Sequence, residues 1–346
     1  MIRPRCLLPV LLLTAACATT GEDDATDGID EAALGTGKAD LAAWSGGALA
    51  GAVRAANTLT LAELDDDAAL AARAAKAIVA RRPLRGIAAL DAVPYVGPVA
   101  LTRLVAYADA QGWTTSDMAP VPAGPFTMGH PGGFRFEPLH EVMLSAYWID
   151  RFEVTNADWA ACIAAGACRP LNGDHYHGAG YTALGDRPVT AMQWYEADAY
   201  CAWAGKRLPS EAQWEKAARG PADLRVQPWG DAPRTCERAQ VVGCQGAGTP
   251  RPAAIGTHPA GSSPYGVEDL IGNVREFVSD SYNEFEPTCA TPCVDPEGIP
   301  ASAADHGYHG VRGGSFGTIA GVGGLLLHER GGHWWSSDIG FRCALQ

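Results

Sequence analysis

Several features are missing from this sequence, and each absence excludes a class of protein. There is no Cys-x-x-Cys pair, so a structural zinc site of the finger type is not indicated. Acidic residues outnumber basic ones, and the net charge of -13 opposes binding to nucleic acid or to an anionic membrane surface. The chain also has no internal repeat, no phosphate-cradling loop and no recognisable serine–histidine–aspartate signature.

The residues that are abundant indicate a folded protein with many loops. With 346 residues the chain has room for two domains. Its 47% hydrophobic residues and 10 tryptophans provide ample material for a core. The 41 glycines and 24 prolines favour a loop-rich architecture over a helical bundle.

The first residues predict export. Arg3 and Arg5 form a basic start, and the apolar run 6–16 has the length of a signal-peptide core but is too short to span a bilayer. Small residues precede Cys17, a pattern that resembles a bacterial lipobox, whose cysteine becomes the diacylated first residue of the mature protein. The alternative is an ordinary secretory signal with an incidental cysteine.

We therefore expect a signal peptide at 1–16 and lipidation at Cys17, which would hold the protein on a membrane of the cell envelope. The mature protein would be periplasmic or surface-exposed, and it would be secreted if the anchor is absent. Residues 17–42 are acidic and lack periodicity, so we expect a solvated tether.

The cysteine count agrees with an oxidising compartment. Of 10 cysteines, removing Cys6 with the signal and Cys17 by lipidation leaves eight, an even number that predicts disulfides. Their spacing suggests three disulfides that each close a short loop, and it leaves one pair of cysteines that are far apart in sequence. The pairs are Cys162 with Cys168, Cys236 with Cys244, Cys289 with Cys293, and Cys201 with Cys343.

Residues 43–114 are predicted to form a small all-α domain. Thr60 and Glu63 have capping-box spacing. Two helical faces follow, separated by a tight turn at 93–98. The first carries Leu70, Ala74, Ala77 and Ile78 and ends at Pro83, and the second carries Leu101, Leu104, Val105 and Ala108.

This helix, turn and helix resembles a helix-hairpin-helix module, a family in which hairpin glycines let backbone N–H groups approach a DNA phosphate. Here Tyr95 stands at the first hairpin position and the protein is acidic, so nucleic acid is the less favoured partner. The favoured interpretation is a packed domain that positions the rest of the chain.

Residues 117–346 are predicted to form the second domain. Alternating apolar residues around Val121, Phe126 and Val142 predict short strands, and helices are expected at 194–203 and from Ser210. Ser210 and Gln213 have capping-box spacing, and Trp214 and Ala218 are the expected buried residues of that second helix.

Ordered motifs along this region resemble the formylglycine-generating enzyme, or sulfatase-modifying factor, family. The motifs are Phe126–Gly129, Pro138–His140, Phe152–Asn156, Pro188-Val189 with Trp194, Ala199–Trp203, Gly205–Glu215, Pro228–Asp231, Gly272–Val274, Val311–Ser315 and Gly340–Cys343. The resemblance implies an α+β fold related to C-type lectins, with little regular secondary structure. It also implies a structural disulfide between Cys201 and Cys343.

The resemblance implies a structural calcium ion as well. The family's motif places side-chain ligands at Asp269 and Glu276 and main-chain carbonyl ligands at Gly272 and Val274. Oxygen ligands around a flexible turn suit calcium. The alternative is a turn with N-capping acids. Of the family's second calcium site, Gln240 and Val241 match two positions.

The copper chemistry of the family is expected to be absent. Family members that generate formylglycine hold copper(I) with two thiolates, and these positions fall on Thr318 and Gly323. Soft copper(I) selects sulfur, and 316–327 contains no cysteine. Iron-dependent sulfoxide synthases with this domain need a histidine-rich helical domain, and 43–112 contains no histidine.

Two functions of different classes follow. The favoured one is a non-catalytic, calcium-stabilised scaffold whose loops at 170–187 and 280–310 bind a glycan, a peptide or an envelope protein. The alternative is an oxidoreductase that acts on protein or small-molecule substrates through an unrecognised site. Histidines at 175, 177, 306 and 309 could hold a metal, although histidines on polar loops are more often exposed or hydrogen-bonded.

Overall fold

The computed structural model describes residues 40–129, 139–171, 184–221, 224–244, 251–281, 293–296, 308–318, 328–331 and 336–346. These residues belong to one compact unit that spans Lys38–Gln346. The predicted signal peptide, Cys17 and nearly all of the tether lie outside the described residues. Within the described ranges, no helix is both long and apolar enough to cross a membrane.

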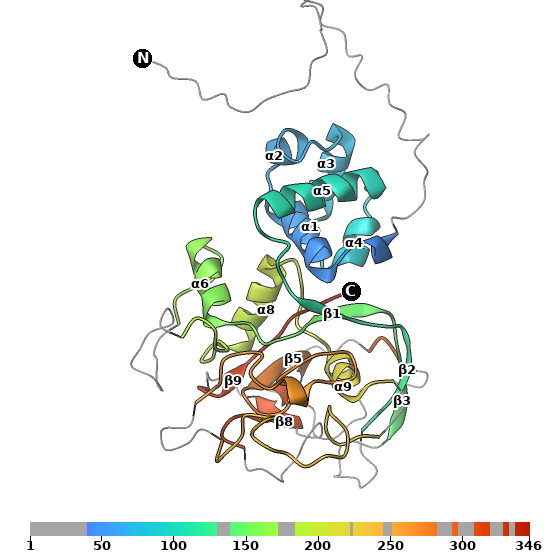
Figure 1. The fold of residues 1–346 in the computed structure, drawn as a ribbon. Coiled ribbons are helices and arrows are strands. Elements are labelled where there is room, and N and C mark those ends of the chain that lie inside the picture. Colours follow the sequence, from blue (N-terminus) through green and yellow to red (C-terminus); the bar gives the residue numbers. More distant parts are fainter. Residues whose placement is uncertain are drawn as a thin grey trace, which may run out of the picture. The chain divides into compact units, whose positions relative to one another are not determined.

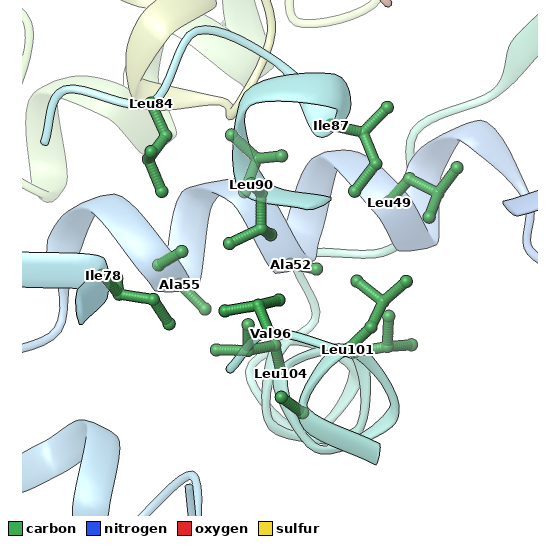
Figure 2. Packing of buried hydrophobic residues seen from close by; sticks show 14 of the residues in the cluster. Leu49, Ala52, Ala55, Ile78, Leu84, Ile87, Leu90, Val96, Leu101 and Leu104 are labelled. Carbon is green, nitrogen blue, oxygen red and sulfur yellow. The ribbon is translucent and has the colours of Figure 1, made fainter. Parts of the chain in front are cut away.

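The region that precedes the strands is helical, as predicted (Figure 1). Its side chains bury a continuous apolar core to which each of the longer helices contributes (Figure 2). The elements are η2 Leu41–Ala43, α1 Gly46–Thr58, α2 Leu61–Asp65, α3 Ala72–Arg81, α4 Ile87–Asp91 and α5 Pro98–Ala110.

The predicted helix signals explain where these helices begin and what they bury. Thr60 and Glu63 form the expected capping box at the start of α2. Proline stands at the first position of α5, where its missing N–H costs no helical hydrogen bond. The buried side of α5 contains the four residues of the predicted stripe together with Ala100. Apolar periodicity therefore located this helix correctly.

Three small sheets are formed by the described residues. Their strand orders are β1-β4-β10, β2-β3-β6 and β8-β7-β5-β9. The strands are β1 Met118–Val121, β2 Gly124–Met128, β3 His140–Leu144, β4 Tyr147–Asp150, β5 Arg275–Ser281, β6 Cys293–Val294, β7 His309–Arg312, β8 His328–Gly331, β9 Ile339–Gly340 and β10 Ala344–Leu345. This mixture of helices and short sheets is the predicted α+β class.

Three helices accompany the sheets, namely α6 Asn156–Ala164, α8 Trp194–Trp203 and α9 Glu211–Arg219. The last two agree with the prediction, and α9 has the expected Ser210–Gln213 capping box. Trp214 and Ala218 of α9 are fully buried. Helix α6 was not predicted, although Thr155 and Asp158 form a capping box at its start. A short 3-10 turn, η3, spans Pro259–Gly261.

Three of the four predicted disulfides are present. Cys162 bonds Cys168, Cys236 bonds Cys244, and Cys201 bonds Cys343. The last of these links α8 to the end of the chain across 142 residues of sequence. Cys293 is also disulfide-bonded, whereas Cys289 lies outside the described residues.

The helical region shares its core with the strands that follow. Met118 of β1 and Leu345 of β10 belong to the same apolar cluster as α1–α5. At Gly205, after α8, the backbone approaches α1 so closely that a Cβ atom would lie 2.0 Å from the Ala50 carbonyl oxygen. Only glycine allows this approach. The predicted boundary between 114 and 117 stays a prediction, because no independent observation tests it.

Gly205→Ala is expected to lower the melting temperature more than Gly166→Ala. Both glycines have positive φ, 76° and 73°, so both variants incur the left-handed backbone cost of about 1 kcal/mol. A Cβ at Gly166 meets no atom within 4 Å, whereas one at Gly205 clashes with α1. Overpacking should add roughly 1–3 kcal/mol of destabilisation at Gly205. Equal melting temperatures would contradict the close approach.

Candidate functional site

A buried ion pair lies at the centre of the predicted calcium motif. Arg342 donates from Nε to Glu276 Oε2 and from Nη2 to Glu276 Oε1, each at 2.7 Å. Trp214 Nε1 donates to the same Oε2 at 2.7 Å. The side chains of Glu276 and Arg342 are 1% and 0% exposed, so the pair is removed from water. Charge-assisted bonds in such a fork are strong and directional.

The other end of the motif is a tight turn. Asp269, Gly272 and Asn273 have φ values of 57°, 81° and 53°. Asp269 accepts from the Gly256 N–H at 3.1 Å and lies 3.1 Å from His258 Nδ1. Asn273 donates to Glu153 Oε1 at 3.0 Å and is fully buried. Side chains distant in sequence thus hold the turn in place.

Glu153 adds a third acid to this region. Burial raises the pKa of Glu153 well above its usual value, and the neighbouring charges of Asp269 and Glu276 raise it further, whereas Arg342 lowers it. Its Oε2 atom is buried and has no hydrogen-bond partner among the described residues. Sequence reasoning missed Glu153 and Arg342 as parts of this group, although both lie in motifs that carried the family resemblance.

The residues predicted as calcium ligands offer the atoms that calcium prefers. Their two acidic side chains, however, are already hydrogen-bonded to other protein groups. Asp269, Gly272, Val274 and Glu276 offer only oxygen ligands. Both oxygens of Glu276, however, are bonded to Arg342 or Trp214, and Asp269 is bonded to His258 and Gly256. Within the described ranges, no three His, Cys, Asp or Glu side chains are grouped as a metal site. Calcium stays a prediction.

The second predicted calcium position is partly occupied by protein contacts. The Gln240 carbonyl accepts from the Asn273 N–H at 2.8 Å, and the Gln240 side chain donates to the Arg251 carbonyl at 3.3 Å. Val241 is buried in the apolar cluster beside Trp214. These contacts connect the second position to the first turn.

The segment that begins at Arg312 is held by a second group of buried charges. Arg312 is fully buried and donates to Glu211 at 3.0 Å and to Glu215 at 2.6 Å, both on α9 or at its start. Glu215 also bonds Arg219 at 2.8 Å. Burial, with repulsion from Glu211, raises the pKa of Asp280 to about 7. The two bonds from Arg312 therefore fix the segment that begins at this residue against α9.

The two predicted copper positions are Thr318 and Gly323. Thr318 Oγ1 accepts from the Ser315 N–H at 2.8 Å and so closes a tight turn. Ser315 donates to Asp338 at 3.0 Å, and Arg275 binds the same carboxylate at 2.6 Å. Burial alone would raise the pKa of Asp338, but the Arg275 bonds hold it below its usual value. Gly323 lies outside the described residues.

No reduced thiol is present in the part of the chain that the structure describes. All seven described cysteines form disulfides. A cysteine elsewhere in the described fold therefore does not replace the missing thiol at Thr318. Of the histidines considered as metal ligands, His309 stacks on Trp194 with ring centroids 3.7 Å apart. The other three, at 175, 177 and 306, lie outside the described residues.

Two cavities are lined by described residues. One, of about 480 Å³, is lined by Arg85, Trp194, Asp198, Arg207 and Gln346 among others. The second, of about 370 Å³, includes Arg54, Trp113, Trp203 and Lys206 in its lining. Both volumes fall in the range of small-molecule sites.

Most of the chain matches a known protein family. A family model described as the sulfatase-modifying factor enzyme 1-like domain (FGE-sulfatase) matches residues 104–346. The chain is 32% identical over 297 residues to the formylglycine-generating enzyme of Streptomyces coelicolor, covering 67% of this chain and 90% of that protein.

A second relative is hercynine oxygenase of Mycolicibacterium smegmatis, 33% identical over 239 residues, which cover 58% of this chain and 54% of that protein. The chain spans about half the length of the hercynine oxygenases it matches. Among solved structures, PvdO from Pseudomonas aeruginosa is similar, with a TM-score of 0.55 and 26% identity, covering 66% of this chain and 93% of that chain.

Glu276→Gln is expected to lower the free energy of unfolding by about 3–5 kcal/mol, because it leaves Arg342 charged and buried without its partner. Asp117→Asn provides the control. It breaks an ion pair with Arg151 in which the two side chains are 59% and 32% exposed, so about 0–1 kcal/mol is expected. Urea unfolding of both variants measures the difference. Similar losses would show that the buried pair contributes little.

Proposed function

Because the chain belongs to the sulfatase-modifying factor family, we propose that it is a non-catalytic member that acts as a binding module and does not generate formylglycine. The observation that supports the proposal is the position of Thr318, where the family's resemblance places a copper-binding thiolate. Its hydroxyl oxygen accepts a hydrogen bond from the Ser315 N–H and has a structural role in the turn.

The chemistry of the ligand supports the same conclusion. Copper(I) prefers thiolates, and a threonine hydroxyl is a hard ligand that stays protonated at neutral pH. The described cysteines are all oxidised, so no thiol among the described residues can substitute. The copper-dependent thiol oxidation of the family would need two sulfur ligands, and the second position, Gly323, has no side chain.

The ligand of the module is a glycan, a peptide or an envelope protein bound by the loops at 170–187 and 280–310. Most of these loops lie outside the described residues. The described elements next to them are rigidly fixed, since Cys162–Cys168 closes the turn after α6 and Cys293 is disulfide-bonded. Surface loops positioned by a rigid scaffold often carry binding residues.

A second candidate is an oxidoreductase that uses a site other than the two thiolate positions. The similarity to proteins named hercynine oxygenase and formylglycine-generating enzyme favours it. The helical region lacks the histidines that the iron-dependent relatives are expected to need, since 43–112 contains none.

An oxygen electrode distinguishes the two candidates. The purified protein, titrated with copper(I) and mixed with a cysteine-containing peptide, is expected to consume no oxygen above the protein-free background. The formylglycine-generating enzyme of Streptomyces coelicolor serves as the positive control under the same conditions. Copper-dependent oxygen consumption by this chain would overturn the non-catalytic proposal.

We also propose a calcium ion at the Asp269–Glu276 turn. The charges support it, since the carboxyl groups of Glu153, Asp269 and Glu276 all act on one guanidinium, that of Arg342, and burial with the neighbouring acids raises the pKa of Glu153. A divalent cation would offset the excess negative charge. The melting temperature is expected to rise by several degrees when calcium replaces a chelator, and no rise is expected in Asp269→Asn. An equal melting temperature with and without calcium would remove this proposal.

The third proposal is export with a lipid anchor at Cys17, supported by the basic start, the short apolar run and the small residues before the cysteine. Expressed in a bacterial host, the parent protein is expected in the membrane fraction and Cys17→Ser in the soluble fraction. Mass spectrometry of the mature N-terminus identifies the acyl groups. Unchanged partitioning of the variant would exclude the anchor.

A further inference from the structure

The guanidinium of Arg54 in α1 contacts two indole rings. Its guanidinium carbon lies 4.2 Å from the ring centroid of Trp113 and 3.8 Å from that of Trp203, both within cation–π range. The close approach at Gly205 brings the end of α8, and with it Trp203, against α1. Cation–π contacts use the ring faces and the charge of the group, so they leave its N–H donors for other partners.

One N–H donor of this guanidinium has no acceptor among the described residues. Arg54 Nε is buried without a hydrogen-bond acceptor. Burial lowers the pKa of Arg54 to about 10, so the group keeps its positive charge at neutral pH. A buried cationic donor without an acceptor is costly, and folded proteins usually satisfy such groups. Arg54 is also the only charged residue of α1, so the helix itself offers no counter-ion.

Arg54 lines the cavity of about 370 Å³. The other cation of the lining, Lys206, is paired with Asp150 at 2.5 Å, and Asp117 of the lining is paired with Arg151 at 3.0 Å. Arg54 is therefore the lining cation that is available to an incoming anion. The apolar part of the lining includes Phe152, Val154, Ala161 and Ile255.

We propose that this cavity binds a small monocarboxylate with an apolar body, whose carboxylate accepts hydrogen bonds from the edge of Arg54. A planar carboxylate matches the fork of N–H donors. A doubly charged phosphate is disfavoured relative to a monocarboxylate, because the four acidic residues of the lining, Asp117, Asp150, Glu153 and Asp158, repel its second charge as well. The site uses no residue of the 312–318 segment, so it goes beyond the proposed function and does not depend on it.

Tryptophan fluorescence and calorimetric titration of the full chain test the proposal with sodium benzoate, neutral benzamide and inorganic phosphate. Benzoate is expected to bind at least tenfold more tightly than benzamide or phosphate. Arg54→Met keeps the long apolar stem but removes the donors, and is expected to weaken benzoate binding at least tenfold. Arg73→Met is the matched control, because Arg73 stacks on the exposed ring of Tyr95 at 5.2 Å and does not line the cavity.

Arg54→Lys keeps the charge without the planar fork and is expected to bind benzoate more weakly than the parent, which gives a second variant if Arg54→Met does not fold. Three results would overturn the proposal: no benzoate binding by the parent, equal binding of benzoate and benzamide, or unchanged binding in a folded Arg54→Met. None of these results bears on copper-dependent oxygen consumption, so the two proposals fail separately.

Discussion

The buried ion pair between Glu276 and Arg342 is the contact on which the rest of the C-terminal fold depends. Besides the fork to Glu276, Arg342 donates to the carbonyl groups of Asp150, Arg151 and Glu268. One side chain thus connects β5, the end of β4 and the turn before Asp269. The next residue, Cys343, adds the covalent link to α8 and donates its N–H to Asp150. With short sheets and many loops, such contacts replace the long strand ladders of other folds.

Buried ion pairs also explain how the turn around Thr318 keeps its conformation without the copper-binding thiolates. Arg312 bonds Glu211 and Glu215, so α9 positions the segment that precedes Thr318. Thr318 then satisfies the Ser315 N–H with its own side chain. The turn can therefore persist without thiolates, which is consistent with a binding module that retains the family's fold. The cavity that Arg54 lines contains no residue of the 312–318 segment, so the binding site proposed there does not depend on the thiolate positions.

Local sequence signals predicted the elements whose stabilising contacts are close in sequence. Capping boxes at Thr60 and Ser210 and the stripe along α5 gave helices that the structure confirms. Helix α6 was missed, because its capping box at Thr155 precedes a short segment with weak apolar periodicity. The partner of Glu276 was missed as well, because its ionic contact joins residues 66 positions apart. No local pattern encodes such a contact.

The sequence by itself determined the α+β class, the family, the pairing of Cys162 with Cys168 and of Cys236 with Cys244, and the absence of sulfur at Thr318, since these depend on residue type and local spacing. Only the tertiary structure decided that Glu276 faces an arginine, that Glu153 joins the same acidic group, and that Trp113 and Trp203 enclose Arg54. The physical reason is that ion pairs and stacked rings act over a few ångströms between segments that are far apart along the chain, and folding alone brings them together.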